Sequence, residues 1–194
     1  MKAPSELDRR PVLVAIAGPN GAGKTTFYHS HIAPAGLKYV NADVLAGELG
    51  LEAYVAADAA DALRRALVKE RESFAFETVF SDPVGDKLKF LQETSKAGYT
   101  VILCFVGLAG ADVSEERVAM RVSQGGHDVP AEKLRARFPR TMANLKRAVQ
   151  TLPFIYIFDN GVLSKPFREV AVFKQGRLAR KSKAPPAWLI RILR

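Results

Sequence analysis

Cysteine and long apolar stretches are scarce in this sequence. Its 194 residues include a single cysteine, Cys104, which excludes an intramolecular disulfide framework and favours a reducing compartment. The longest apolar runs, such as residues 12–17 and 101–106, fall far short of the roughly 18 residues that a membrane-spanning helix needs. No long apolar stretch typical of a secretory signal precedes the first run. We therefore expect a cytoplasmic protein without a membrane partner.

Acidic residues are scarce only at the C-terminal end. The chain has a formal net charge of +9 at pH 7. Residues 1–160 hold 20 Lys and Arg against 19 Asp and Glu, whereas residues 161–194 hold nine against one. A polyanion-binding protein would more naturally spread its positive charge along a groove. We therefore do not expect a nucleic-acid partner, and we interpret residues 167–194 as a basic hairpin followed by a short helix.

Short apolar runs alternate with longer stretches rich in Ala, Leu, Lys, Arg and Glu. This alternation predicts an α/β fold with a mainly parallel central sheet, and no linker or repeat divides residues 1–194 into more than one domain. Pro83 and Pro130 are placed to start helices, whereas Pro139 should kink or divide one. Strands are expected at 12–17, 38–41, 74–80, 99–106, 154–159 and 170–174. Helices are expected from residue 24 and at 42–48, 52–71, 84–97, 113–124 and 131–151.

One glycine-rich segment fits the phosphate-binding pattern G-x-x-x-x-G-K-[ST] completely, after an expected strand and at the start of an expected helix. Its backbone amides can surround a β-phosphate, its lysine can reach the β- and γ-phosphates, and its threonine can ligate Mg²⁺. We therefore expect a three-layer α/β/α P-loop NTPase with ATP and Mg²⁺ as cofactors. The expected ATP-binding residues are Gly18, Pro19, Asn20, Gly21, Ala22, Gly23, Lys24, Thr25 and Thr26, with Thr25 as the metal ligand.

The loop also resembles that of ABC transporter ATPases, but the rest of the sequence disfavours this class. Residues 154–159 imitate a Walker B strand that ends at Asp159, yet Asn160 stands in the place of the usual catalytic glutamate. The three histidines, His29, His31 and His127, all precede Asp159, so none can serve as the switch histidine.

Carboxylates follow two further expected strands. Ligands of open α/β sheets bind outside the carboxyl ends of the strands, so Asp43 should face the same crevice as the phosphate-binding loop. There it could accept the proton of an acceptor hydroxyl in phosphoryl transfer, or cap the helix at 44–48, and the two roles are compatible. Glu77 could contact the acceptor or a magnesium-bound water, or pair with a nearby base. Thr78 could add a hydroxyl contact.

An arginine-rich segment, residues 117–140, is interpreted as a helical lid. Its bases could stabilise charge on the transferring phosphoryl group, and each could instead belong to a solvated helix face. Gly125 and Gly126 would form a flexible joint. His127 could be a hydrogen-bond donor of the lid, a helix-cap contact or a surface residue. The bases are Arg117, Arg121, Lys133, Arg135, Arg137 and Arg140.

These pieces together resemble the zeta-toxin superfamily of P-loop kinases, and more closely its short bacterial branch described as predicted ABC-type ATPases. The matching motifs span residues 12–160. They are Ala17-Gly-Pro-Asn-Gly-Ala-Gly-Lys-Thr-Thr26, Asn41-Ala-Asp43, Phe76-Glu-Thr78, Arg117-Val-Ala-Met-Arg121, Gln124-Gly-Gly-His-Asp-Val-Pro130 and Asp159-Asn160.

The resemblance implies an ATP-dependent kinase whose acceptor is the 3′-hydroxyl of the sugar in UDP-N-acetylglucosamine, and it implies a possible antitoxin partner. By position Lys24 matches the P-loop lysine, Asp43 the catalytic base and Glu77 the substrate-contacting acid. Arg117 or Arg121 matches the first lid arginine. The second has no clean counterpart, and His127, Arg137 and Arg140 are the candidates for its place.

Three functional hypotheses follow. The first is a kinase for a UDP-activated amino sugar, with Asp43, Lys24, Arg117 and Arg121 catalytic and with acceptor contacts from Glu77, Thr78, His127 and Arg137. The second keeps the fold and changes the acceptor to a nucleoside, an antibiotic or another sugar. The third is a nucleotide-dependent binding module or switch with slow, acceptor-independent ATP hydrolysis.

Overall fold

A single mixed sheet organises the chain. The computed structural model describes residues 4–126, 128–162 and 164–193, and over this part of the chain seven strands lie in the order β2-β3-β1-β4-β5-β6-β7. Neighbours from β2 to β5 are parallel, whereas β6 and β7 are antiparallel. The predicted mainly parallel α/β sheet is therefore confirmed. The strands are β1 (Val12–Ala17), β2 (Lys38–Val40), β3 (Phe74–Thr78), β4 (Thr100–Gly107), β5 (Phe154–Asp159), β6 (Arg168–Lys174) and β7 (Arg177–Lys181).

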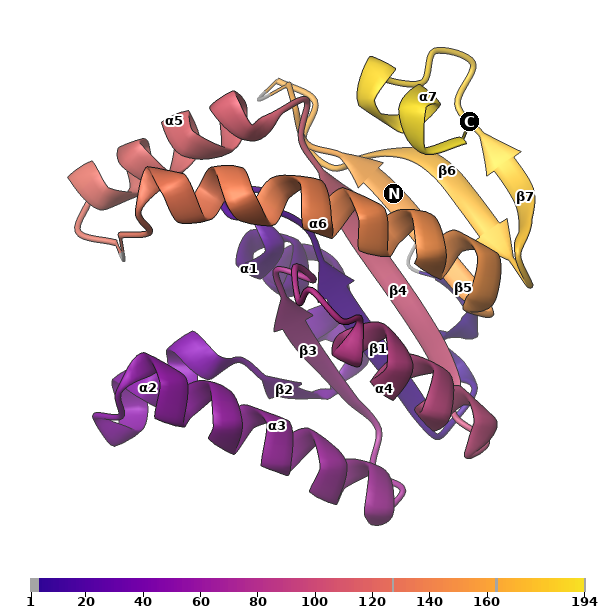
Figure 1. Ribbon diagram of the computed structural model, residues 1–194. Coiled ribbons are helices and arrows are strands. Elements are labelled where there is room, and N and C mark those ends of the chain that lie inside the picture. Colours follow the sequence, from indigo (N-terminus) through magenta and orange to yellow (C-terminus); the bar gives the residue numbers. More distant parts are fainter. Residues whose placement is uncertain (1–3, 127, 163, 194) are drawn as a thin grey trace.

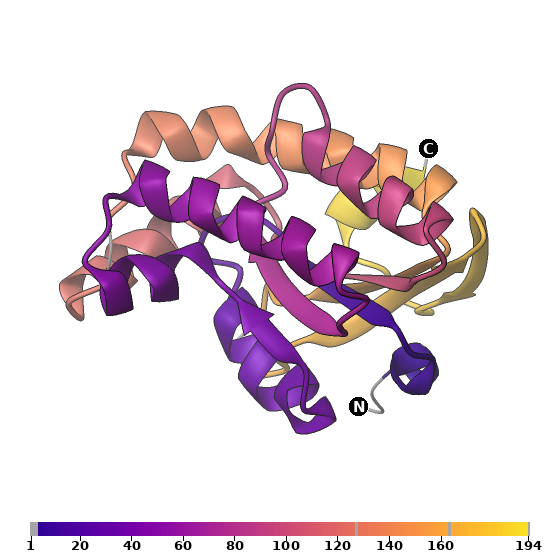
Figure 2. The same cartoon turned by 90° about the horizontal axis from the view of Figure 1, so that it is seen from below.

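Helices cover both faces of this sheet, so the fold has three layers (Figures 1 and 2). Every residue of β1 is buried, which explains why its sequence is continuously apolar. Leu13, Ala15 and Ala17 face the core shared with α3, α4, α6 and α7, whereas Val12, Val14 and Ile16 face α1 and the turns after it. The helices are α1 (Lys24–Phe27), α2 (Ala42–Leu49), α3 (Ala53–Lys69), α4 (Asp86–Lys96), α5 (Ala111–Ser123), α6 (Ala131–Thr151) and α7 (Ala187–Leu193).

Pro139 is expected to kink or divide the last long helix, and it does not divide it, because α6 runs continuously from Ala131 to Thr151. An internal proline costs a helix about 3 kcal/mol. Contacts on both sides of Pro139 hold the helix against other elements. Before it, Arg135 forms a bidentate ion pair with Glu115 of α5, with nitrogen–oxygen distances of 2.7 and 2.9 Å. After it, Thr141 and Asn144 donate hydrogen bonds to backbone carbonyls of residues 79–82.

The helix expected to start near Pro83 instead begins at Asp86. Gly85, with φ of +85°, forms its N-terminal boundary in the left-handed region that glycine tolerates. Residues 79–85 form a loop between β3 and α4. Because side chains of α6 bind its carbonyls, this loop is held against the carboxyl edge of the sheet.

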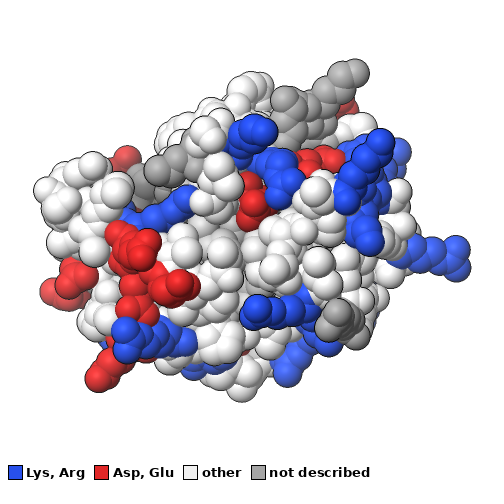
Figure 3. Space-filling model, turned by 90° about the horizontal axis from the view of Figure 1, so that it is seen from above, with Lys and Arg blue, Asp and Glu red and all other residues white. Residues whose placement is uncertain are grey.

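The predicted C-terminal hairpin and terminal helix are both present. Trp188 and Leu189 of α7 are buried in the core, whereas every residue of the edge strand β7 is exposed. Figure 3 shows one face of the molecule, on which acidic side chains gather toward the left and basic side chains toward the centre and right. Within the described residues, no helix is both long and apolar enough to cross a membrane.

Candidate functional site

The phosphate-binding loop joins β1 to α1 at the carboxyl edge of the sheet. Gly18 passes so close to β4 that a Cβ atom there would lie 2.1 Å from the carbonyl oxygen of Val106. Gly23 has φ of +84° and opens α1, which begins at Lys24 as predicted. The loop therefore needs glycine at both positions, for close packing at one and for a left-handed backbone at the other.

The Lys24 side chain is buried, with 7% of the residue exposed. Its Nζ atom donates a hydrogen bond to the carbonyl oxygen of Pro19 at 3.2 Å and lies 4.0 Å from a carboxylate oxygen of Glu77. Burial lowers the pKa of Lys24, and the charges of Arg121 and Arg137 act in the same direction, against the opposing attraction of Glu77 and Asp43. The site thus concentrates charges of both signs around this ammonium group.

Glu77 stands at the end of β3 and joins three elements through its carboxylate. Its Oε2 atom accepts hydrogen bonds from the hydroxyls of Thr25 at 2.9 Å and Tyr39 at 2.7 Å, and from the Asn41 amide at 3.4 Å. The Asn41 amide also donates to the Tyr39 hydroxyl at 3.0 Å. Burial, followed by the Glu77 charge, raises the pKa of Tyr39, so its hydroxyl stays protonated as a donor.

Sequence reasoning gave Tyr39 and Asn41 no role in this network. A usable signal was present, since residues two apart in an extended strand point to the same side. Tyr39 and Asn41 have this spacing, and they follow the P-loop unit in the chain. Both side chains reach Glu77 at the end of β3, the strand with which β2 pairs in parallel.

The oxygen atoms around Thr25 suit a hard cation. Mg²⁺ takes oxygen ligands, retains several waters and needs only one or two protein groups. The Thr25 hydroxyl and the Glu77 carboxylate provide such oxygens 2.9 Å apart. Across the described residues, no cluster of three His, Cys, Asp or Glu side chains is present, and Mg²⁺ bound to phosphates does not require one.

Asp43 does not cap the following helix, the alternative to a catalytic role that the sequence left open. The cap of α2 is Asn41, whose side-chain oxygen accepts a hydrogen bond from the Asp43 backbone nitrogen at 2.8 Å. Asp43 lies in the first turn of α2 and lines a cavity of about 530 Å³. Because Asn41 satisfies the helix end, the Asp43 carboxylate is not needed as a cap.

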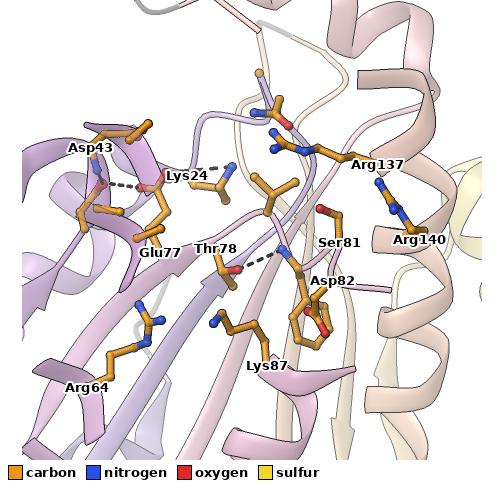
Figure 4. A pocket seen from close by; sticks show the side chains of 18 of the residues that line it. Lys24, Asp43, Arg64, Glu77, Thr78, Ser81, Asp82, Lys87, Arg137 and Arg140 are labelled. Carbon is orange, nitrogen blue, oxygen red and sulfur yellow. Dashed lines mark hydrogen bonds and ion pairs between the residues drawn. The ribbon is translucent and has the colours of Figure 1, made fainter. Parts of the chain in front are cut away.

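That cavity brings together most of the side chains singled out from the sequence (Figure 4). Its predicted lining residues are Asn20, Gly21, Lys24, Asp43, Glu77, Thr78, Arg121, Arg137 and Arg140. Sequence reasoning missed further polar lining residues, namely Arg64 of α3, Ser81 and Asp82 of the loop after β3, and Lys87 of α4. Loop residues that do not line it, such as Thr26, keep their ATP-binding role as a prediction.

Arg117 and Arg121 are separated by the structure. Arg121 lines the cavity, whereas Arg117 donates a hydrogen bond at 2.6 Å to the carbonyl oxygen of Asn160, after β5. The Ser114 hydroxyl, one turn earlier in α5, donates to the Asn20 carbonyl oxygen at 2.7 Å. Helix α5, which carries the first part of the expected lid, is therefore attached to the P-loop. His127, the remaining lid candidate, lies outside the described residues.

Gly125 and Gly126 end α5. Their backbone nitrogens donate to the carbonyl oxygens of Val122 and Arg121 at 2.9 and 3.0 Å, the pattern of a Schellman cap. A Cβ atom on Gly126 would lie 2.5 Å from Cγ of Arg121. The second glycine thus gives the Arg121 side chain room to pass.

Solved structures with the same arrangement of elements were found by structural comparison, although no protein-family model and no curated protein matches the chain. The AvrRxo1-ORF1:AvrRxo1-ORF2 complex with sulphate ions superimposes with a TM-score of 0.70 at 19% identity, covering 96% of this chain and 65% of that chain. The PezAT chromosomal toxin–antitoxin system of Streptococcus pneumoniae gives 0.60 at 17% identity, covering 94% and 77%. The chain therefore shares the fold of these structures.

A third structure with this fold is a putative kinase from Chloroflexus aurantiacus, with a TM-score of 0.57 at 20% identity, covering 80% of this chain and 88% of that chain. The present chain spans less than two thirds of the AvrRxo1-ORF1 complex chain that it matches. At these identities the likeness establishes the fold, and activity has to be argued from the site.

Asn160 positions the P-loop within this fold, a role that sequence reasoning did not assign. Its side-chain amide donates to the Ala22 carbonyl oxygen at 2.9 Å, and its backbone nitrogen donates to Gly107 of β4 at 3.0 Å. Its own carbonyl oxygen binds Arg117. One buried residue therefore joins the P-loop through its side chain, and the sheet and α5 through its backbone.

Replacing Asn160 by alanine should loosen the P-loop. Leaving the Ala22 carbonyl without its donor costs about 1–3 kcal/mol, so Tm should fall by several degrees and the KM for ATP should rise roughly tenfold. Thermal unfolding and steady-state kinetics measure the two effects. The exposed side chain of Gln150 offers a control, Gln150→Ala, which should change neither. An unchanged KM for ATP in Asn160→Ala would show that the loop is held without this amide.

Proposed function

We propose that this protein is an ATP-dependent kinase that transfers the γ-phosphate to a hydroxyl group of a small acceptor molecule. The observation that carries the proposal is the convergence of Lys24, Asp43, Glu77 and Arg121 on one cavity at the carboxyl edge of the sheet. A nucleotide-binding switch does not need side chains that position a second substrate. A carboxylate and arginines facing the same cavity suit transfer to a second substrate.

The P-loop half of the cavity would hold the nucleotide. The loop amides and Lys24 bind the β- and γ-phosphates, and Thr25, with Glu77 behind it, holds the metal ion. Mg²⁺, when bound, neutralises charge on the phosphate oxygens. Tyr39 and Asn41 keep the Glu77 carboxylate oriented toward Thr25 through the hydrogen bonds described above.

Asp43 is assigned as the base. It accepts the proton of the acceptor hydroxyl while that oxygen forms a bond to the γ-phosphorus. The bond between this phosphorus and the bridging oxygen to the β-phosphate breaks, and ADP leaves with the bond electrons. Arg121 and Arg137 stabilise negative charge on the transferring group. Arg117 acts indirectly, by fixing α5 to Asn160.

The acceptor proposed from the family resemblance is UDP-N-acetylglucosamine, with Glu77 and Thr78 among its contacts. The similar structures also support a protein partner, since one is titled as a toxin–antitoxin system and another as a complex of two ORF products. We propose accordingly that an antitoxin-like protein binds this chain.

An acceptor panel tests the kinase proposal. The protein is incubated with Mg²⁺-ATP and with UDP-N-acetylglucosamine, nucleosides, aminoglycosides or free sugars, and ADP release is followed together with the mass of the acceptor. Acceptor-dependent ADP release with a gain of one phosphate on the acceptor is expected, most strongly with UDP-N-acetylglucosamine. Slow ADP release that no acceptor stimulates would favour a nucleotide switch instead.

A further inference from the structure

The cavity has a second cationic region, away from the P-loop. Arg64 of α3 and Lys87 of α4 lie on the opposite side of Glu77 and Thr78 from Lys24 (Figure 4). Neither belongs to a motif of the sequence, and the phosphate-transfer scheme above uses neither.

Arg64 is a charged group in an unusually buried position. Only 5% of this residue is exposed, and its guanidinium lies 5.0 Å from the centroid of the Phe76 ring. Its NH2 atom donates to Asp61 at 2.6 Å, whereas its buried Nε atom has no hydrogen-bond partner among the described residues. Buried polar atoms are almost always hydrogen-bonded, so an unpartnered one indicates a missing ligand or water.

Within the part of the chain that the structure describes, the other buried side-chain atoms without a hydrogen-bond partner belong to residues that line the same cavity. They are Oδ1 of Asn20, in the P-loop, and both carboxylate oxygens of Asp82, in the loop after β3. Unsatisfied groups therefore occur at both ends of the cavity and include donors as well as acceptors. The Asp82 oxygens suit hydroxyl or amide N–H groups of a bound molecule.

The positive charges of Arg64 and Lys87, at the end of the cavity away from the P-loop, share one carboxylate partner. Asp61 is the carboxylate that Arg64 and Lys87 share, at 2.6 and 2.8 Å, and it also binds Arg65 at 3.0 Å. Burial acts to raise the pKa of Asp61, but hydrogen bonds from Lys87, Arg64 and Arg65 outweigh it and hold the pKa well below its usual range. One carboxylate thus faces three cations.

The cavity as a whole repeats this imbalance. Six cationic side chains line it, Lys24, Arg64, Lys87, Arg121, Arg137 and Arg140, against four carboxylates: Asp43, Glu77 and Asp82, which also line it, and Asp61, which binds Arg64 and Lys87. The phosphates of ATP would neutralise those near the P-loop. Arg64 and Lys87 lie beyond them, and a second anionic group is the ligand chemistry that fits there.

We infer that Arg64 and Lys87 form an anion subsite for the acceptor, which therefore carries a phosphate or carboxylate group in addition to the hydroxyl that is phosphorylated. Asp82 receives hydroxyl or N–H groups of the same molecule. This inference rests on the proposed kinase function and narrows the class of acceptors. Neutral sugars and uncharged nucleosides should be poor acceptors.

Binding to the nucleotide-loaded protein tests the subsite without relying on turnover. The P-loop is first saturated with Mg²⁺ and a non-hydrolysable ATP analogue, so that added anions cannot occupy it. Calorimetry then compares matched pairs of probes: uridine 5′-monophosphate with uridine, glucose 6-phosphate with glucose, and glucuronate with glucose. The phosphate and carboxylate arms identify which anion the subsite prefers.

Lys87→Met is the decisive variant because it keeps the length of the side chain and removes its charge. At least one anionic probe should bind wild type about tenfold more tightly than its neutral partner, and Lys87→Met should remove most of that preference. Lys89→Met, a change of an exposed lysine in the same helix that does not line the cavity, serves as the control and should retain the preference. Arg64→Lys, which keeps the charge and loses the planar fork, should weaken anion binding less than Lys87→Met.

The outcomes separate the two proposals. Equal binding of anionic and neutral probes, no detectable binding of any anionic probe, or the same loss of preference in Lys87→Met and Lys89→Met would each overturn the subsite. ADP release with neutral acceptors alone would also overturn it and leave the kinase intact. A charge preference that depends on Lys87, combined with failure of every acceptor to stimulate ADP release, would retain the anion site and reject the kinase.

Discussion

Replacing Lys24 by methionine should lower kcat by about 10²- to 10³-fold while leaving the protein at least as stable as wild type. The rate effect is that expected when one preorganised donor to a developing charge is removed. The stability effect follows from burial. Because burial lowers the pKa of Lys24 in the folded protein, this side chain costs free energy of folding at every pH below its ordinary, unfolded-state pKa, pH 7 included.

Methionine removes this cost and fills the same space. The Glu77 carboxylate keeps its hydrogen bonds from Thr25, Tyr39 and Asn41, so the substitution does not leave it without partners. Steady-state kinetics with the acceptor found in the panel, together with thermal unfolding at pH 7, measure the two effects. Lys96→Met, at an exposed position of α4, should change neither.

A lower kcat together with an unchanged or higher Tm distinguishes a functional lysine from a structural one. Loss of activity accompanied by a large fall in Tm would mean that Lys24 supports the fold, and full activity in Lys24→Met would remove it from the phosphate site.

Spacing and strand edges made part of the site predictable. The P-loop pattern depends on neighbouring residues, so Lys24 and Thr25 could be placed from the sequence alone. Asp43 and Glu77 could be brought to the same crevice because the carboxyl ends of parallel strands meet at one edge of a sheet. The detailed contacts of these carboxylates could not be predicted. The cap role considered for Asp43, for example, belongs to Asn41, two residues earlier.

The second region of the cavity could not be predicted because helices supply it. Asp61, Arg64 and Arg65 have the i, i+3 and i, i+4 spacing of ion pairs on an exposed helix face, where such pairs are common. Only the packing of α3 against the sheet buries Arg64 and turns its guanidinium toward the cavity. Lys87 reaches the same place from α4, 23 positions further along the chain.

Packing also decided between alternatives that local sequence left open. Arg117 and Arg121 share one helix face, but the end of β5 binds the first and the second lines the cavity. Pro139 illustrates the opposite case, in which a strong local preference is overridden. The contacts that Arg135, Thr141 and Asn144 make with residues distant in the chain keep α6 continuous.

Asp43 provides the sharpest test of the proposed chemistry. Asp43→Asn keeps the size of the side chain and removes its ability to accept a proton, so kcat should fall by about 10²- to 10⁴-fold, the usual contribution of general base catalysis. The affinity for ATP should change little, because the residues assigned to the phosphates belong to the P-loop. Turnover and ATP binding are measured separately, the latter with a non-hydrolysable analogue.

Stability should respond weakly to the same change. Asp43 lies in the first turn of α2, where a negative charge stabilises the helix by about 0.3–1 kcal/mol, while the cap itself stays with Asn41. Glu48→Gln, in the same helix, removes one negative charge at an exposed position and should leave kcat unaltered. Because capping is excluded as the main role of Asp43, a large loss of kcat with an intact fold would identify its carboxylate as the base. Normal turnover in Asp43→Asn would require a different group to take the proton.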